Sequence, residues 1–283
     1  MTSINHSNDD VPSTIFTIEG DGPLPIPPVY EFSEMLQDVL FEKQDIEEML
    51  SFLKTDKAPG PDGLSPLILK RASATLSYPL SILFNRSMQV SKVPAEWKQA
   101  LVSPIFKKGS KKAPGNYRPV SLTCIVCKIM EKLVRVKIVQ HLSKFNLISR
   151  DQHGFVKGRS CSTQLLEVLD AWTEALDDGG CVDVIYMDFQ KAFDTVPHRR
   201  LIQKVSAHGI EGRLLGWLRD FLADREQRVV VNGTRSSIAK VTSGVPQGSV
   251  LGYLLMEISA SIPQLVLCRR YVRLIRRKTI VQC

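Results

Sequence analysis

The chain has 283 residues, of which 43% are hydrophobic and 23% charged, and its formal net charge is +8 at pH 7. This composition is ordinary for a globular protein of one large or two modest domains. No hydrophobic run approaches the length of a membrane span, which argues against a membrane protein. The charge is uneven, because residues 1–50 hold eleven acids against one lysine and the rest holds 36 basic residues against 18 acids. Such a basic body is expected to attract nucleic acid, the alternative being a basic surface with no partner.

The cysteines and histidines give no metal-ligand pattern. The six cysteines are irregularly spaced, and a polar stretch follows Met1. This favours reduced thiols and an intracellular protein. Cys124 and Cys127 have C-x-x-C spacing, but they fall in a helical pattern and no second pair follows. Buried thiols are therefore favoured over a zinc site.

The first third of the chain is predicted to be helical after an irregular start. Residues 1–40 are interpreted as an acidic, Pro-rich leader, disordered or extended. A helix is predicted over 43–54, and the Pro/Gly-rich run APGPDG (58–63) ends it. Helical patterns then cover 65–90, with Ser65 as N-cap and Pro66 in the first turn.

The remaining elements mix helices and strands. Two strands with a basic loop between them form a long hairpin, and a second hairpin carries Asn232-Gly233, a strong type I′ signal. The strands are expected at 100–106, 117–123 and 182–188, the second hairpin at 228–241, and helices at 123–146, 162–177 (starting from Ser162), 199–208 and 212–223. Since there is no strict βαβ alternation, the expected class is α+β.

The run 181–198 carries the first candidate site. Val182, Val184, Tyr186 and Asp188 share one face of the predicted strand, which places Asp188 at the strand's end. A carboxylate there suits metal-assisted chemistry, and a cap on the following turn is the alternative.

Basic and Gly-rich segments supply the other candidates. Six basic residues and no acid lie between 97 and 118, so this hairpin could hold a triphosphate, or it could be a solvated loop. The run 243–252 has glycines for close backbone approach to a ligand, and Gln247 as a hydrogen-bonding group, or is an ordinary turn. Lys157 and Arg159 could contact a nucleic-acid backbone or help to cap a helix.

Taken in order, six segments resemble the reverse transcriptases of non-LTR (LINE-type, jockey-like) retrotransposons. They are KAPGPDG (57–63), PIFKKG (104–109), NYRPVSL (116–122), HGFVKGRSC (153–161), YMDFQKAFDTVP (186–197) and SGVPQGSVLG (243–252). The resemblance covers residues 41–252. It implies a right-hand polymerase architecture, here fingers with an incomplete palm.

The resemblance also implies roles for individual residues. Asp188 is the first catalytic acid, and with the carbonyl of Phe189 it would bind Mg²⁺. The deoxynucleoside triphosphate (dNTP) would contact Lys107, Arg118, Phe193, Gln247 and Gly248, with Phe193 disfavouring a 2′-hydroxyl. The nucleic-acid contacts would be Lys108, Lys111, Lys112, Lys157 and Arg159. Asp194 would be structural. The implied partners are an RNA template, a DNA primer or target, and dNTP.

The resemblance stops at Gly252. The family would continue with an apolar strand and an aromatic-x-Asp-Asp hairpin, whereas residues 253–283 form a basic tail whose only acid is Glu257. Two-metal chemistry needs more than one carboxylate, so we expect this chain to be inactive. The thumb that would follow the palm in the family is also expected to be absent. A frameshift or gene-model error after residue 252 would explain the tail. The alternative function is a non-catalytic nucleic-acid-binding remnant.

Overall fold

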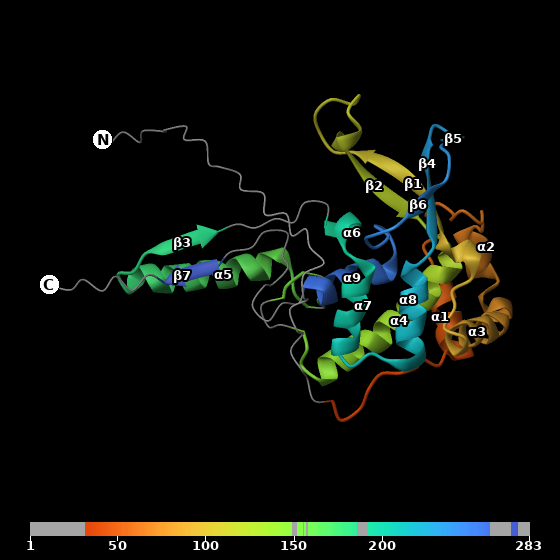
Figure 1. Ribbon diagram of the computed structural model, residues 1–283, viewed down its shortest axis with the longest axis horizontal. Coiled ribbons are helices and arrows are strands. Elements are labelled where there is room, and N and C mark those ends of the chain that lie inside the picture. Colours follow the sequence, from red (N-terminus) through yellow and green to blue (C-terminus); the bar gives the residue numbers. More distant parts are fainter. Residues whose placement is uncertain are drawn as a thin grey trace.

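A computed structural model describes residues 32–148, 152–154, 156, 158–185, 192–260 and 273–276. These residues form a mixture of helices and strands, which confirms the expected α+β class (Figure 1). The α-helices are α1 (Lys43–Ser51), α2 (Pro66–Arg71), α3 (Ser73–Gln89), α4 (Ile125–Lys144), α5 (Cys161–Asp177), α6 (Ala192–Thr195), α7 (His198–Ala207), α8 (Gly212–Leu222) and α9 (Val250–Ala260). Two 3₁₀ turns, η1 (Ala95–Lys98) and η2 (Pro114–Asn116), directly precede the first and the second strand.

The main sheet combines two segments that lie far apart in the sequence. Its strands are β1 (Gln99–Phe106), β2 (Tyr117–Leu122), β4 (Arg225–Val231), β5 (Thr234–Arg235) and β6 (Ala239–Val241), in the order β2-β1-β4-β5 with β6 also on β4. The β1–β2 hairpin is antiparallel, as the sequence predicts, whereas β1 and β4 run parallel. Asn232 and Gly233 have φ of 50° and 80°, which fits the predicted type I′ turn.

The core lies where helices α1, α3, α4, α7, α8 and α9 pack together beside the sheet (Figure 1). Among its largest fully buried side chains are Trp217, Phe84 and Phe221. The indole N–H of Trp217 donates to the Ser87 hydroxyl at 3.0 Å, so the buried polar atom of this large ring is satisfied. Within the described ranges, no helix has the length and apolar character needed to span a membrane.

Two helix starts test the predicted caps. The hydroxyl of Ser65 accepts from the Leu67 amide, and Pro66 is the first residue of α2, as predicted. Helix α5 begins at Cys161, one residue before the predicted start at Ser162, and its N-cap is Ser160. Ser160 and Thr163 form a reciprocal capping box, with bonds of 3.1 and 2.9 Å between each amide and the other hydroxyl.

The predicted leader and tail also differ in part from the structure. Residues 32–40 lie against the helical body, where the Leu36 amide donates to the Gly209 carbonyl at 2.9 Å and Val39 is buried. Apolar side chains in an otherwise polar run account for this packing. Helix α9 was not predicted, although Leu251, Leu254, Leu255 and Ile258 have helical spacing and are buried.

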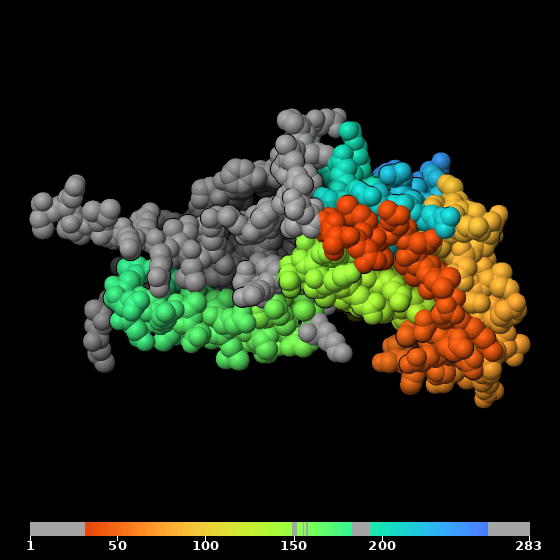
Figure 2. All heavy atoms as spheres, turned by 90° about the horizontal axis from the view of Figure 1, so that it is seen from below, coloured from red at the N-terminus to blue at the C-terminus, as the bar shows by residue number. Residues whose placement is uncertain are grey.

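The helix α5 lies beside the two-stranded sheet of β3 (Val182–Ile185) and β7 (Arg273–Arg276), away from the main sheet (Figure 1). In the space-filling view, α5 (green) and the residues of α1–α3 (red to orange) occupy opposite ends of the visible face, with α4 between them (Figure 2). Of the predicted strand 182–188, the described residues are 182–185, and all four form β3.

Candidate nucleotide and nucleic-acid site

The basic hairpin places two predicted triphosphate contacts on one face. Arg118 of β2 lies opposite Ile105 of β1, and strand alternation puts Lys107, two residues after Ile105, on the same side. The amide of Lys107 donates to the Asn116 carbonyl at 2.8 Å, which extends the ladder by one bond. Both cationic side chains are exposed. They can therefore reach a bound polyanion without loss of packing.

The tip of the hairpin is held by local contacts. The phenol of Tyr117 donates to the Lys111 carbonyl at 2.8 Å, and the Lys111 ammonium lies 5.8 Å from the centre of the Phe106 ring. The side chain of Asn116 donates to the Ser110 carbonyl at 2.9 Å. The lysines of the tip, Lys108, Lys111 and Lys112, are exposed. The ammonium groups of these lysines can therefore contact a partner in solution, while local hydrogen bonds fix the backbone that carries them.

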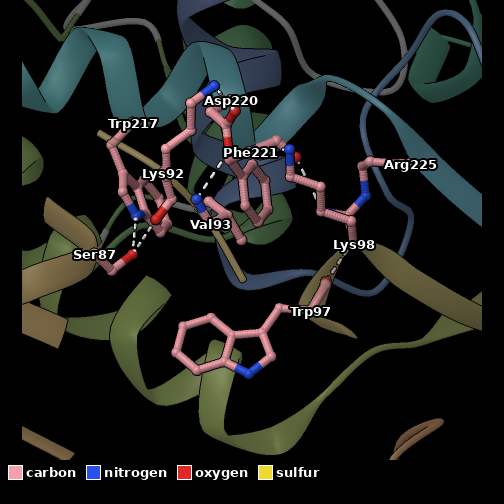
Figure 3. A network of polar contacts seen from close by, with 9 residues as sticks. All are labelled: Ser87, Lys92, Val93, Trp97, Lys98, Trp217, Asp220, Phe221 and Arg225. Atoms are coloured by element: carbon pink, nitrogen blue, oxygen red, sulfur yellow. Dashed lines mark hydrogen bonds and ion pairs between the residues drawn. The ribbon is translucent and has the colours of Figure 1, made fainter. Parts of the chain in front are cut away.

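At its base the hairpin is anchored by a buried acid, Asp220 of α8 (Figure 3). Asp220 lies 2.9 Å from the Lys98 ammonium and 2.8 Å from that of Lys92, and it accepts from the Val93 amide at 2.8 Å. Burial raises the pKa of Asp220, but these three partners outweigh it and hold the pKa below its ordinary value. Lys98 therefore does not belong to the exposed cationic surface, where its sequence position placed it.

The Gly-rich loop 243–249 lies along the outer edge of β2. The amide of Ser121 donates to the Gln247 carbonyl at 2.8 Å, so the loop takes the hydrogen-bonding place of a further strand. Gly248 has φ of 123°, and a Cβ there would lie 2.5 Å from the Ser121 carbonyl oxygen. Only glycine permits this approach. Gln247 and Gly248 thus lie three residues along β2 from Arg118.

The same loop contacts α6 on its other side. The amide of Val245 donates to the Phe193 carbonyl at 2.7 Å, and the Gly244 amide donates to the Val196 carbonyl at 2.8 Å. Gly244 has φ of 81°, and a Cβ there would lie 2.3 Å from the Phe193 carbonyl oxygen. The Phe193 ring packs edge-on against Tyr253 of α9, with centroids 5.3 Å apart. The loop therefore brings Phe193 and Gln247 into one neighbourhood.

The remaining predicted contacts are less well placed. Arg159 donates to the Gln152 carbonyl at 2.6 Å, which ties down the segment before α5. Asp188, Phe189 and Lys157 lie outside the described residues. Within the described part of the chain, no group of three or more His, Cys, Asp or Glu side chains could bind a metal ion. Cys124 and Cys127 are buried free thiols, and burial raises the pKa of Cys124 to about 12.

The basic hairpin and the Gly-rich loop lie next to each other in the structure. Comparison with known proteins shows to which family a chain with these two segments belongs. Residues 105–263 match the family described as "Reverse transcriptase (RNA-dependent DNA polymerase)", which is more than half of the chain. The chain belongs to the reverse transcriptase family. The match includes the hairpin tip, the loop and α9.

Relatives of this reverse transcriptase domain come from transposons. It is 31% identical over 222 residues to "Probable RNA-directed DNA polymerase from transposon BS" of Drosophila melanogaster, which covers 78% of this chain and 24% of the relative. It is 31% identical over 219 residues to "RNA-directed DNA polymerase from mobile element jockey" of the same fly, covering 77% of this chain and 24% of the relative. The chain thus spans about a quarter of these relatives. The resemblance to reverse transcriptases of non-LTR retrotransposons is confirmed.

Glu257 of this reverse transcriptase domain lies within a helix rather than at a strand end. One of its carboxylate oxygens, Oε1, is buried and has no hydrogen-bond partner. Burial raises the pKa of Glu257 to about 7, and the charge of Arg135 acts in the opposite direction. Glu257 therefore lies in a different setting from the strand-end acid that the family pattern would supply.

Two buried ionisable residues, Glu131 and Arg225, were not predicted from the sequence. Glu131 of α4 is fully buried and accepts from the amides of Val250 and Leu251 at 2.7 and 3.0 Å. Arg225 at the start of β4 is also buried and donates to the Phe221 and Trp97 carbonyls. For Glu131 a signal existed, since a single acid follows VCKIM in an apolar helix pattern. For Arg225 no local signal existed.

Proposed function

We propose that this reverse transcriptase domain binds a dNTP between the basic hairpin and the Gly-rich loop. Lys107 and Arg118 contact the triphosphate, and Phe193, Gln247 and Gly248 contact the sugar and base. The observation that carries the proposal is the bond from Ser121 to Gln247, which puts the loop on the strand that presents Arg118. The cationic side chains of the hairpin are suited to bind a triphosphate. The loop, which has no bulky side chain at Gly248, lets a sugar and base approach its backbone closely.

The proposed nucleic-acid partners are an RNA template and a DNA primer or target. The exposed lysines of the hairpin tip, Lys108, Lys111 and Lys112, contact their phosphates, together with Lys157 and Arg159. Support comes from the basic charge of the chain and from the exposure of the three tip lysines. In right-hand polymerase terms, we assign the main sheet and α1–α3 to the fingers and the neighbourhood of Asp188 to the palm.

The proposed cofactor is Mg²⁺, bound by Asp188 and the carbonyl of Phe189. Bound there, the ion would supply Lewis-acid stabilisation of the transferring phosphate. The proposal for these two residues rests on the sequence resemblance.

We further propose that the 283-residue chain does not incorporate nucleotides. Residues 253–283 contain no aspartate, and an aromatic-x-Asp-Asp segment is absent from this sequence. The second candidate function is that of a non-catalytic nucleic-acid-binding protein. The absence of the aromatic-x-Asp-Asp segment favours it, because the exposed tip lysines can contact phosphates without a metal ion.

Binding of a fluorescent dNTP to the chain with an RNA–DNA primer-template tests the nucleotide site. Arg118→Ala should weaken binding at least tenfold, because it removes a bidentate phosphate contact. Arg71→Ala removes an exposed arginine from α2 and should leave the affinity unchanged. Equal affinities of wild type and Arg118→Ala would contradict the proposed site.

Primer extension on an RNA template with Mg²⁺ separates the two candidate functions. We expect no incorporation by the wild-type chain, whereas RNA binding should weaken steeply as salt rises. Incorporation that Asp188→Ala abolishes would overturn the proposed inactivity. A flat response of RNA affinity to salt would overturn the nucleic-acid interface.

A further inference from the structure

The carboxylate of Glu131 accounts for two of the first N–H groups of α9. An α-helix leaves its first amides without partners inside the helix, and a buried start must satisfy them otherwise. The amides of Val250 and Leu251 donate to Glu131, and the Gly252 amide donates to the hydroxyl of Ser249 at 3.0 Å. A side chain from α4 therefore completes the start of α9 together with the N-cap residue Ser249.

The carboxyl group of Glu131 is fully buried, so its polar atoms must be stabilised by partners inside the protein. Burial raises its pKa, while the amides of Leu251 and Val250 and the charge of Arg225 act against that rise. The thiol of Cys127, one helical turn earlier, lies 3.6 Å from its second oxygen, Oε1. If the Glu131 side chain moved away from the start of α9, it would lose its hydrogen bonds to the Val250 and Leu251 amides. A buried carboxyl group without such bonds is strongly unfavourable.

The start of α9 is also the end of the Gly-rich loop. Only Ser249 separates the proposed dNTP contacts Gln247 and Gly248 from the two amides that Glu131 holds. On its other side the loop is held by Ser121 of β2. Because β2 and α4 are consecutive, Ser121 and Glu131 belong to one continuous segment that grips the loop at two points.

We propose that Glu131 is a positioning residue for nucleotide binding, which sets the place of Gln247 and Gly248 by holding the first amides of α9. This inference rests on the proposed dNTP site. It goes beyond it by assigning a function to a residue that touches neither substrate nor metal. The competing account is that Glu131 only stabilises the fold, as any buried helix cap would.

Amide hydrogen exchange tests whether Glu131 holds the loop. In Glu131→Ala the amides of Val250 and Leu251 should exchange at least tenfold faster, with a smaller change in Glu131→Gln, whose amide oxygen still accepts. The control is Leu50→Ala, which opens a cavity in the core at α1 and lowers global stability without touching the loop. Selective acceleration in the Glu131 variants supports the proposal, and acceleration no greater than in Leu50→Ala overturns it.

Binding of a fluorescent dNTP tests whether that hold matters for the site. At a temperature where every variant is folded, Glu131→Ala should weaken binding about tenfold, Glu131→Gln less, and Leu50→Ala not at all. Selective loop exchange with unchanged dNTP affinity would make Glu131 a structural cap only and overturn the positioning function. If the wild type itself binds no dNTP, the proposed nucleotide site fails, and the exchange result still decides whether Glu131 holds the loop. If Glu131→Ala does not fold, Glu131→Gln carries both measurements.

Discussion

The basic hairpin and the Gly-rich loop form the two walls of the candidate site, and they are held in place by different physics. The cationic side chains of the hairpin tip are exposed, and local bonds within residues 106–117 shape its backbone. The loop 243–249 is held by hydrogen bonds to β2, α6 and α7, and two of its glycines lie where a Cβ would collide with backbone. Substitutions of the charged side chains should therefore leave the fold of the hairpin intact. A substitution that changes the backbone of the loop should disturb the three elements that it contacts.

The difference shows where each kind of function is located. Contacts with phosphates along a nucleic acid tolerate variation, because charge acts over several ångströms and exposed lysines adapt. Recognition of one nucleotide needs atoms at fixed positions, which only packed surroundings supply. Four substitutions test this contrast, each with a matched control.

The largest effect on stability is expected at the base of the hairpin, where the charged side chains are nearly buried. Asp220→Ala should lower the free energy of unfolding by about 3–5 kcal/mol, because Lys98 loses its partner while nearly buried. Asp38→Ala also removes an acid paired with a cation, Arg213, but both side chains are about half exposed, at 45% and 57%. It should cost less than about 1 kcal/mol. Urea denaturation measures both, and equal costs would contradict the assigned burial.

A smaller effect is expected for the loop. Gly244→Ala should cost about 2–4 kcal/mol, since it combines the strain of positive φ with a collision against the Phe193 carbonyl. Gly233→Ala, at nearly the same φ, has no heavy atom within 4 Å of the added Cβ and should cost only about 1–2 kcal/mol. Thermal unfolding compares them. If the two variants melt together, the close approach of the loop to α6 is wrong.

The helix that follows the loop should add a pH dependence. The pKa of Glu257 is raised to about 7 from an ordinary value near 4.5, so its protonated form is favoured in the folded state. Its contribution to stability is complete below pH 4.5 and is lost as the pH rises through 7. Glu257→Gln should therefore be more stable than wild type above pH 7, by on the order of 1 kcal/mol.

Melting temperatures from pH 4.5 to 8 measure this dependence. The curves of wild type and Glu257→Gln should converge at the acid end. Glu48→Gln changes an exposed acid in α1 and should follow the wild-type curve. A constant difference between wild type and Glu257→Gln at all pH values would show that titration of this residue is not the cause.

The smallest effect on stability is expected at the hairpin tip. The double variant Lys111→Ala, Lys112→Ala should keep its free energy of unfolding within about 0.5 kcal/mol. Its RNA affinity should depend less on salt, with the slope of log K against log salt reduced by about 1.4. The charge-matched control Lys43→Ala, Lys54→Ala, in and near α1, should leave the slope unchanged. A large loss of stability at the tip would erase the contrast between hairpin and loop.

Local patterns in the sequence predicted most of the elements. Helical spacing and caps located α1 to α3, α4, α7 and α8, and Asn232-Gly233 located the second hairpin turn. The errors have local causes as well. Helix α5 begins at Cys161 and not at Ser162, because Thr163 completes a capping box with Ser160. Helix α9 was missed, because the family resemblance suggested a strand after residue 252.

Short runs of residues were enough to predict the family, the basic hairpin and the glycines that the loop requires. All of these are properties of contiguous residues. The packing of distant elements established that β1 pairs with β4, that Lys98 is nearly buried against Asp220, and that Glu131 accepts from the first amides of α9. These contacts join residues about 120 positions apart. The pattern around each residue carries no record of such a partner, because burial and hydrogen bonding are fixed only when distant elements pack together.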